Sequence, residues 1–109
     1  MNINTSIHEQ TCLVEVSGRI DSTNANELGE GLNSVINEGR LQLVLDLANV
    51  DYMSSAGLRE LVSALKKVRG KGDLRLAQPS ERVREVLEMA GLDTIFQIYD
   101  TKQSALQSY

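Results

Sequence analysis

The apolar run Leu-Gln-Leu-Val-Leu-Asp-Leu at 41–47 constrains the fold of this chain more than any other segment. Nearly continuous hydrophobicity over so few residues is typical of a strand that is covered on both faces, as in sheets with parallel crossovers. Amphipathic helical patterns stand on either side of it, at Ala25, Leu28, Leu32, Val35 and Ile36 before it, and at Leu58, Leu61, Val62, Leu65 and Val68 after it. We therefore expect an α/β protein with this strand at its centre.

The remaining segments extend this pattern on both sides. Residues 2–8 and 12–17 alternate apolar and polar side chains, which predicts a hairpin whose second strand ends at Gly18. Residues 74–77 predict a short strand, residues 95–98 a last strand or extended segment, and residues 101–107 a terminal helical turn or two. For the first helix, the N-cap is predicted to be Ser22 or Thr23.

A third helix is predicted after Pro79, with Ser80 as its N-cap and Gly91 as its C-cap. The residues expected to face inward on it are Val83, Val86, Leu87 and Ala90. The resulting order is β-β-α-β-α-β-α with short connections. It predicts a mixed sheet of about four to five strands with helices packed on it, in a single domain over residues 1–109.

The composition excludes several classes of protein. One cysteine, Cys12, permits no internal disulfide and no cysteine-based zinc cluster, which fits a reducing cytoplasm. Eleven Lys and Arg against fifteen Asp and Glu disfavour nucleic acid, whose binding depends on neutralising phosphates. No apolar run approaches the roughly 20 residues that span a bilayer, and no signal peptide is visible. We expect a small cytoplasmic domain that does not insert into a membrane.

Parallel crossovers also predict where a functional site lies. Three segments follow strands that point the same way: residues 18–21, residues 49–56, which we expect to be largely a polar loop, and residues 78–80. Segments of this kind emerge together at the carboxyl edge of the sheet, where α/β proteins usually place their sites.

Two serines, Ser54 and Ser55, lie at this edge, where the amphipathic helix after the central strand is expected to begin. A serine in this position either caps the helix by accepting a backbone N–H bond or accepts a phosphate that the helix N-terminus stabilises. The residue pattern leaves both interpretations open. Met53 is expected in the core, and Asp46 is expected to bind backbone donors near its loop.

Motifs for catalysis and for ligand binding are missing from the sequence. There is no nucleophile elbow, zinc-binding helix, phosphate loop or dinucleotide fingerprint. The single histidine, His8, falls in the predicted hairpin turn. We therefore expect no enzyme activity, no cofactor and no metal. The basic residues Lys66, Lys67, Arg69, Lys71 and Arg75 are expected to form one cluster near the end of the amphipathic helix after the central strand.

The segment Tyr-Met-Ser-Ser-Ala-Gly-Leu at 52–58, preceded by the central strand, resembles the signature of the STAS domain family. It is most similar to the stand-alone bacterial anti-sigma-factor antagonists. Residues 18–21 match the family's turn of Gly, acidic, aliphatic and Asp, except that Arg19 replaces the acidic residue. Residues 88–92 and 95–96 match its C-terminal pattern, so the resemblance covers nearly the whole chain.

The resemblance implies a switch between partners. Unphosphorylated antagonists of this family bind an anti-sigma factor that is also a serine kinase with a GHKL-type ATP site, and so release a sigma factor. The kinase phosphorylates the antagonist at the position of Ser55, which separates the complex, and a PP2C-type phosphatase restores it. Ser54, where the family commonly has Asp, is the second choice of acceptor. The partner-binding residues implied are Asp21, Ser54, Ser55, Ala56, Gly57 and Arg59, the last standing where family members often carry Gly.

Three alternatives remain at this stage. In the first, the domain is a non-phosphorylated subunit of a larger assembly, such as a lipid transporter or signalling scaffold. In the second, it is a partner switch whose client is not a sigma factor. In the third, it binds a small ligand or nucleotide at the sheet edge, an interpretation that the missing phosphate loop disfavours.

Overall fold

The computed structural model describes all 109 residues of the chain. In chain order its elements are β1 (Asn2–His8), β2 (Thr11–Ile20), α1 (Ala25–Asn37), β3 (Gln42–Met53), α2 (Ser55–Val68), β4 (Asp73–Ala77), α3 (Glu81–Met89), the 3₁₀ helix η1 (Leu92–Thr94), β5 (Ile98–Tyr99) and α4 (Lys102–Gln107). The strands form one five-stranded sheet in the order β1-β2-β3-β4-β5. β1 is antiparallel to β2, and all other neighbours are parallel, so the predicted mixed α/β sheet is confirmed.

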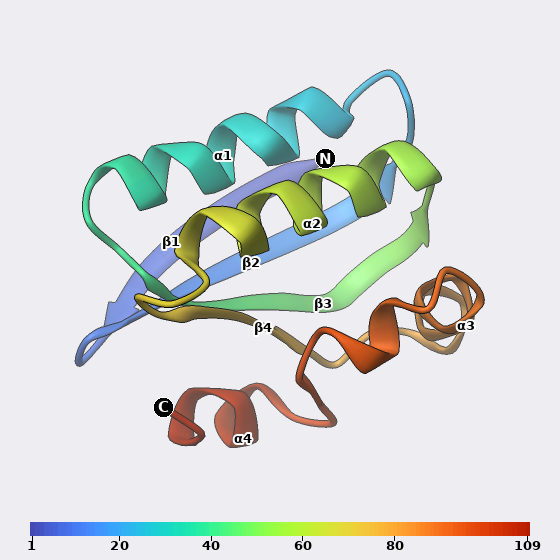
Figure 1. The fold of residues 1–109 in the computed structure, drawn as a ribbon. Helices are drawn as coiled ribbons and strands as arrows, with labels where there is room; N and C mark the ends of the chain where they lie inside the picture. The colour runs from blue at the N-terminus through green and yellow to red at the C-terminus, as the bar shows by residue number, and fades with distance from the viewer.

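The two amphipathic helices cover one face of this sheet. Figure 1 shows α1 and α2 side by side above the strands. Their apolar stripes meet alternate residues of β3 in a core of 23 buried residues. The fully buried leucines of this layer include Leu28, Leu32, Leu43, Leu45, Leu61 and Leu65.

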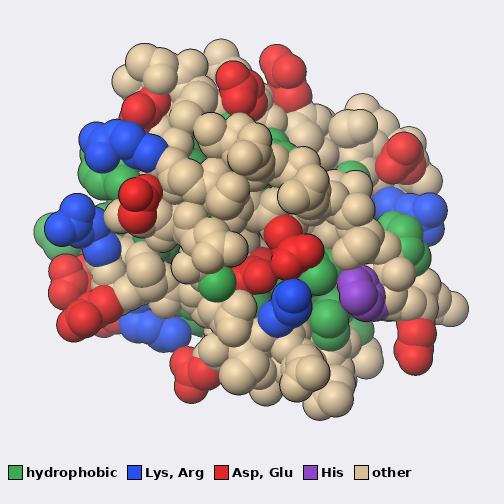
Figure 2. Space-filling model, turned by 180° about the vertical axis from the view of Figure 1, so that it is seen from behind, with side chains coloured by type: hydrophobic (Ala, Val, Ile, Leu, Met, Phe, Trp, Pro, Cys, Tyr) green, Lys and Arg blue, Asp and Glu red, His purple; other side chains and the backbone are tan.

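The other face of the sheet is covered by much less of the chain. Val44 of β3 packs there with Leu13, Ala77 and Ala105 of α4, in a cluster of four buried residues. The central strand is therefore buried on both faces, as its continuous hydrophobicity predicts. Seen from this side, the molecule shows acidic and basic side chains interspersed among polar ones, with hydrophobic ones only in small separate areas (Figure 2).

The strands β2 and β3 both run further than the sequence predicts. Gly18 does not end β2. It adopts a φ of +100°, and the pairing with β3 shifts register between Glu15 and Ser17 and again between Gly18 and Arg19. Beyond these irregularities the two strands pair again, so the first part of the predicted loop at 49–56 is strand instead. β4 pairs only with residues 42–46 of β3, so the last residues of β3 carry the start of α2 well past the end of β4.

Helix boundaries differ from expectation in smaller ways. The N-cap position of α1 is Asn24, which makes no capping bond, and neither Ser22 nor Thr23 caps the helix. Ser80 caps α3 as predicted, accepting a bond from the Val83 N–H, whereas Ala90 is exposed because α3 ends at Met89. The last strand is only two residues long, since the chain first makes the 3₁₀ turn η1.

One of two charged groups with a predicted role lies elsewhere than expected. Arg75 does not join the basic cluster at the end of α2. It lies on β4, where it pairs with Asp73 at 3.0 Å and bonds Ser108. Asp46 is buried within β3 and accepts bonds from the Ala48 N–H and from Gln78, close to its expected role.

Candidate functional site

The three predicted segments meet at the carboxyl edge of the sheet. Ile20 pairs with Met53, and its carbonyl accepts a bond from the Ser54 N–H at 2.9 Å. The Ser80 hydroxyl, at the start of α3, donates to the Val50 carbonyl at 3.2 Å. The ends of β2 and β3 and the start of α3 are therefore tied together around the first turn of α2.

The two serines at this edge have different environments. Ser54 is the N-cap of α2, with extended backbone, and its Oγ accepts a long bond of 3.5 Å from the Gly57 N–H. Ser55 is the first residue of the helix, its side chain is exposed, and its hydroxyl makes no hydrogen bond. The capping interpretation therefore describes Ser54 and leaves the Ser55 hydroxyl free to react.

Asp21 holds the turn between β2 and α1. Its carboxylate accepts bonds from the backbone N–H and the hydroxyl of Thr23 and lies 3.5 Å from Arg19 Nε. The bonds from Thr23 lower the pKa of the Asp21 carboxyl below its ordinary value, and Arg19 adds to this. Asp21 therefore places a fixed negative charge at the edge where Ser55 lies.

Arg19, which departs from the family pattern, joins two of the strands. Its guanidinium lies 4.0 Å from the centroid of the Tyr52 ring while its Nε faces Asp21. The sequence pattern does not predict this contact, because the register shifts in β2 decide which residue of β3 lies opposite Arg19. The pair orders the last residues of both strands beside the start of α2.

Gly57 supports the first turn of α2 from beneath. It is buried, and a Cβ built on it would lie 2.8 Å from Ile20 Cγ2 and 2.9 Å from Met53 Cγ. Met53 is fully buried, as predicted. Ala56 is partly buried against the same core. Gly57 therefore lets the helix start lie close to the ends of β2 and β3, and presents no surface of its own to a partner.

An apolar groove that the sequence did not indicate runs beside Ser55. It encloses about 500 Å³ between α2 and the segment that follows α3, and its lining consists of Ser55, Leu58, Arg59, Val62, Ser63, Lys66, Ala90 and Leu92. Met89, next to Ala90 in the chain, is 89% exposed. The two walls of the groove come from segments about 30 residues apart in sequence, so the periodicity of one helix could not predict the groove.

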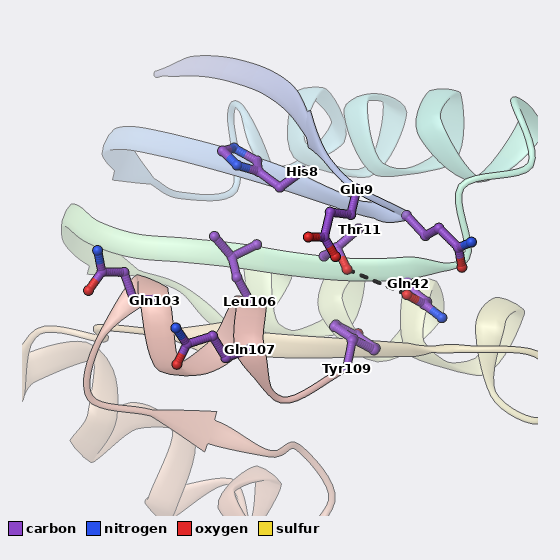
Figure 3. Close-up of a pocket in the computed structure, with 9 residues that line it drawn as sticks. His8, Glu9, Thr11, Gln42, Gln103, Leu106, Gln107 and Tyr109 are labelled. Atoms are coloured by element: carbon purple, nitrogen blue, oxygen red, sulfur yellow. Dashed lines mark hydrogen bonds between the residues drawn. The ribbon is translucent and has the colours of Figure 1, made fainter.

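The largest hollow of the molecule lies elsewhere, at the amino ends of β2 and β3. Figure 3 shows the side chains of His8, Thr11, Gln42, Leu106 and Tyr109 around it, between the hairpin turn and α4. It encloses about 990 Å³ and is open, and its only polar contact among the residues drawn is a 3.4 Å bond from Thr11 to Gln42. His8 is exposed there and bonds Ser6. No cluster of charged or nucleophilic groups faces this hollow.

Comparisons with known proteins match nearly the whole chain. The model of the STAS domain matches residues 2–105. BtrV of Bordetella bronchiseptica, whose name assigns it provisionally to the anti-sigma factor antagonists, is 35% identical over 95 residues, covering 86% of this chain and 82% of BtrV. The anti-sigma-B factor antagonist of Staphylococcus epidermidis is 32% identical over 99 residues, which cover 90% of this chain and 92% of the staphylococcal protein.

Solved structures give the same result for the fold. The crystal structure of an anti-sigma factor antagonist from Mycobacterium paratuberculosis superposes with a TM-score of 0.92 at 27% identity, covering 98% of this chain and 92% of that one. None of the helices of the present chain has the length and apolar character that crossing a bilayer requires.

Proposed function

This chain belongs to the STAS domain family, and from that premise we propose that it is an anti-sigma-factor antagonist controlled by phosphorylation of Ser55. One observation carries the proposal: Ser55 offers an exposed hydroxyl without any hydrogen bond, directly after the serine that caps the helix. In this role Ser55 is the substrate of a kinase, not a catalyst. The relatives named as antagonists support the same class of function.

The proposed partner is an anti-sigma factor with serine kinase activity of the GHKL type. We place its contact surface at the carboxyl edge of the sheet, where Asp21, Ser55 and Arg59 offer accessible polar groups and Ala56 is partly exposed. Ser54 belongs to this surface by position, although its hydroxyl serves the helix cap. Such an exchange of partners takes place in the cytoplasm, in keeping with the single buried thiol of Cys12.

Release of the partner follows from the charge of the phosphate. A phosphoserine carries about −1.5 to −2 charges at pH 7. In the free protein this charge lies in water at the start of α2, where the helix dipole stabilises it by roughly 0.3–1 kcal/mol. In the complex the same charge is buried without compensation, which costs roughly 3–5 kcal/mol and lowers the affinity by hundredfold or more. A PP2C-type phosphatase reverses the change.

Phosphosite mapping by mass spectrometry, on protein isolated from its own cells, tests this function. We expect one phosphate, on Ser55, and none on the Ser55→Ala variant, while Ser54→Ala remains phosphorylated as the matched control. Phosphate on Ser54 alone would keep the mechanism but identify Ser54, not Ser55, as the phosphate acceptor. If neither serine is phosphorylated during growth or under stress, the proposal fails in favour of a fixed subunit of a larger assembly.

A further inference from the structure

One face of α2 carries polar and apolar residues in a regular row beside the groove. Ser55, Arg59, Val62 and Lys66 follow one another at spacings of four, three and four residues, which places them on one side of the helix. All four line the groove, and its opposite wall is formed by Ala90 and Leu92. The groove therefore has apolar walls, the Ser55 hydroxyl at one end and two cations along its length.

The charge of Arg59 has no partner within the chain, unlike those of three other arginines. Arg19, Arg75 and Arg84 each pair with an aspartate, at 3.5, 3.0 and 3.3 Å. Arg59 is exposed and makes no ion pair or side-chain hydrogen bond. An unpaired guanidinium in a groove is available for an anion from outside the chain.

The charge of α2 is opposite to that of the whole protein. The chain has a net charge of −4, yet the exposed charges of α2 are Arg59, Lys66 and Lys67. The only acidic residue of the helix, Glu60, lies instead toward Gly29 of α1, whose added Cβ would meet the Glu60 carboxylate. Charge complementarity therefore identifies an acidic occupant for this groove.

We propose that the groove binds an acidic amphipathic helix of the partner, and that Arg59 exchanges a carboxylate of this helix for the phosphate of Ser55 when the serine is modified. This inference rests on the proposed function. Arg59 and Lys66 are seven residues apart, or about 10 Å along the helix axis. A partner helix with two carboxylates at a similar spacing and apolar side chains between them fits both cations and the walls of the groove.

The exchange follows from the geometry of one helical turn. Residues four apart on a helix lie next to each other, and an acidic group on the N-terminal side of a basic one is the favourable order. A guanidinium binds a phosphate through two parallel hydrogen bonds, more strongly than a neutral donor does. Phosphorylation of Ser55 therefore removes the cation that held the partner, in addition to placing new charge in the interface.

The first test measures the phosphate directly and needs no partner. Protein carrying phosphoserine at position 55 by genetic encoding is titrated and followed by phosphorus NMR, where the second pKa of free phosphoserine is about 6. We expect this pKa to be lower in the wild-type chain than in Arg59→Gln, by about 0.3 or more. Arg40→Gln is the matched control, because Arg40 is also exposed and unpaired but precedes β3 at the other end of the sheet. Equal values in all three proteins would overturn the exchange.

The second test measures binding to the GHKL-type kinase encoded in the same genome. We expect Arg59→Gln to weaken binding of the unphosphorylated chain about tenfold, as the loss of one charge-assisted contact does, while Arg40→Gln leaves it unchanged. Phosphorylation should also reduce the affinity by a smaller factor in Arg59→Gln than in the wild type, since the two changes share one contact.

The two proposals fail in different ways. If the wild-type chain binds and Arg59→Gln binds equally well, the role of Arg59 is overturned and the proposed function stands. If the wild-type chain does not bind the kinase at all, the proposed function fails, and the partner half of the exchange fails with it.

Discussion

At the scale of single residues, two helical glycines of this protein face different surroundings. A Cβ on Gly57 would meet Ile20 and Met53, both fully buried, at distances below 3.0 Å. A Cβ on Gly31 of α1 would meet the terminal Cδ1 of Ile3 at 3.1 Å, and Ile3 is only partly buried. The first contact requires the core to shift, whereas the second requires only a small movement of a side-chain end.

We therefore expect Gly57→Ala to lower the free energy of unfolding by about 1–2 kcal/mol, since the cost of overpacking exceeds the gain in helix propensity. Gly31→Ala, with the same gain in propensity, should leave the stability unchanged or raise it by up to about 1 kcal/mol. Urea unfolding followed by circular dichroism compares the two variants. Equal stability of both variants would show that Ile20 and Met53 can move to accept the added methyl group at little cost in free energy.

At the scale of elements, the start of α2 separates the two serines by their effect on stability. Ser54→Ala removes the cap and should lower the free energy of unfolding by about 1 kcal/mol, whereas Ser54→Asp, which keeps a capping oxygen, should restore it. Ser55→Ala should change it little, because the Ser55 hydroxyl makes no hydrogen bond. Thermal unfolding checks all three variants, and a larger loss in Ser55→Ala than in Ser54→Ala would contradict the assignment of the cap.

The sequence predicts these elements well where hydrophobic spacing is regular. The buried strand β3 and the stripes of α1 and α2 follow from this spacing, and so does the convergence of three segments at the carboxyl edge of the sheet. The end of β3 was missed because Leu47, Val50 and Met53 are buried at a spacing of three instead of two, a result of the irregular pairing with β2. The distinct roles of Ser54 and Ser55 were not predictable either, since they depend on which of two adjacent residues begins the helix.

At the scale of the whole molecule, the last residues of the chain are tied back to the centre of the sheet. The Tyr109 hydroxyl accepts a bond from the Leu43 N–H at 3.1 Å and lies 2.6 Å from the carbonyl oxygens of Leu43 and Asp73. Arg75 lies over its ring, 4.0 Å from the centroid, and bonds the Ser108 carbonyl. These contacts hold α4 against the face of the sheet opposite α1 and α2 (Figure 1).

The same residue gives the stability a dependence on alkaline pH. Burial, together with the nearby Asp73 carboxylate, raises the pKa of the Tyr109 phenol above its ordinary value of 10.0. Above pH 10 the unfolded chain releases this proton while the folded chain keeps it, so the contribution to stability is present below pH 10 and is lost as the pH rises further. We expect Tyr109→Phe to be less stable by about 1–3 kcal/mol at pH 7, because the Leu43 N–H loses its partner.

The difference between the wild type and Tyr109→Phe should then shrink as the pH rises above 10, in urea unfolding at a series of pH values. Tyr52 and Tyr99 are common to both proteins, so their ionisation cancels in the comparison. A constant difference across this range would show that the phenol is not buried.

The free hydroxyl of Ser55 has a consequence for how the proposed phosphorylation stores a signal. Because this hydroxyl makes no hydrogen bond, its modification and restoration break no contact of the fold. The phosphorylated fraction of these chains can therefore change while their total number stays the same. Under the proposed function, the signal is then stored as the ratio of phosphorylated to unphosphorylated chains, and a phosphatase resets it without new synthesis of the protein.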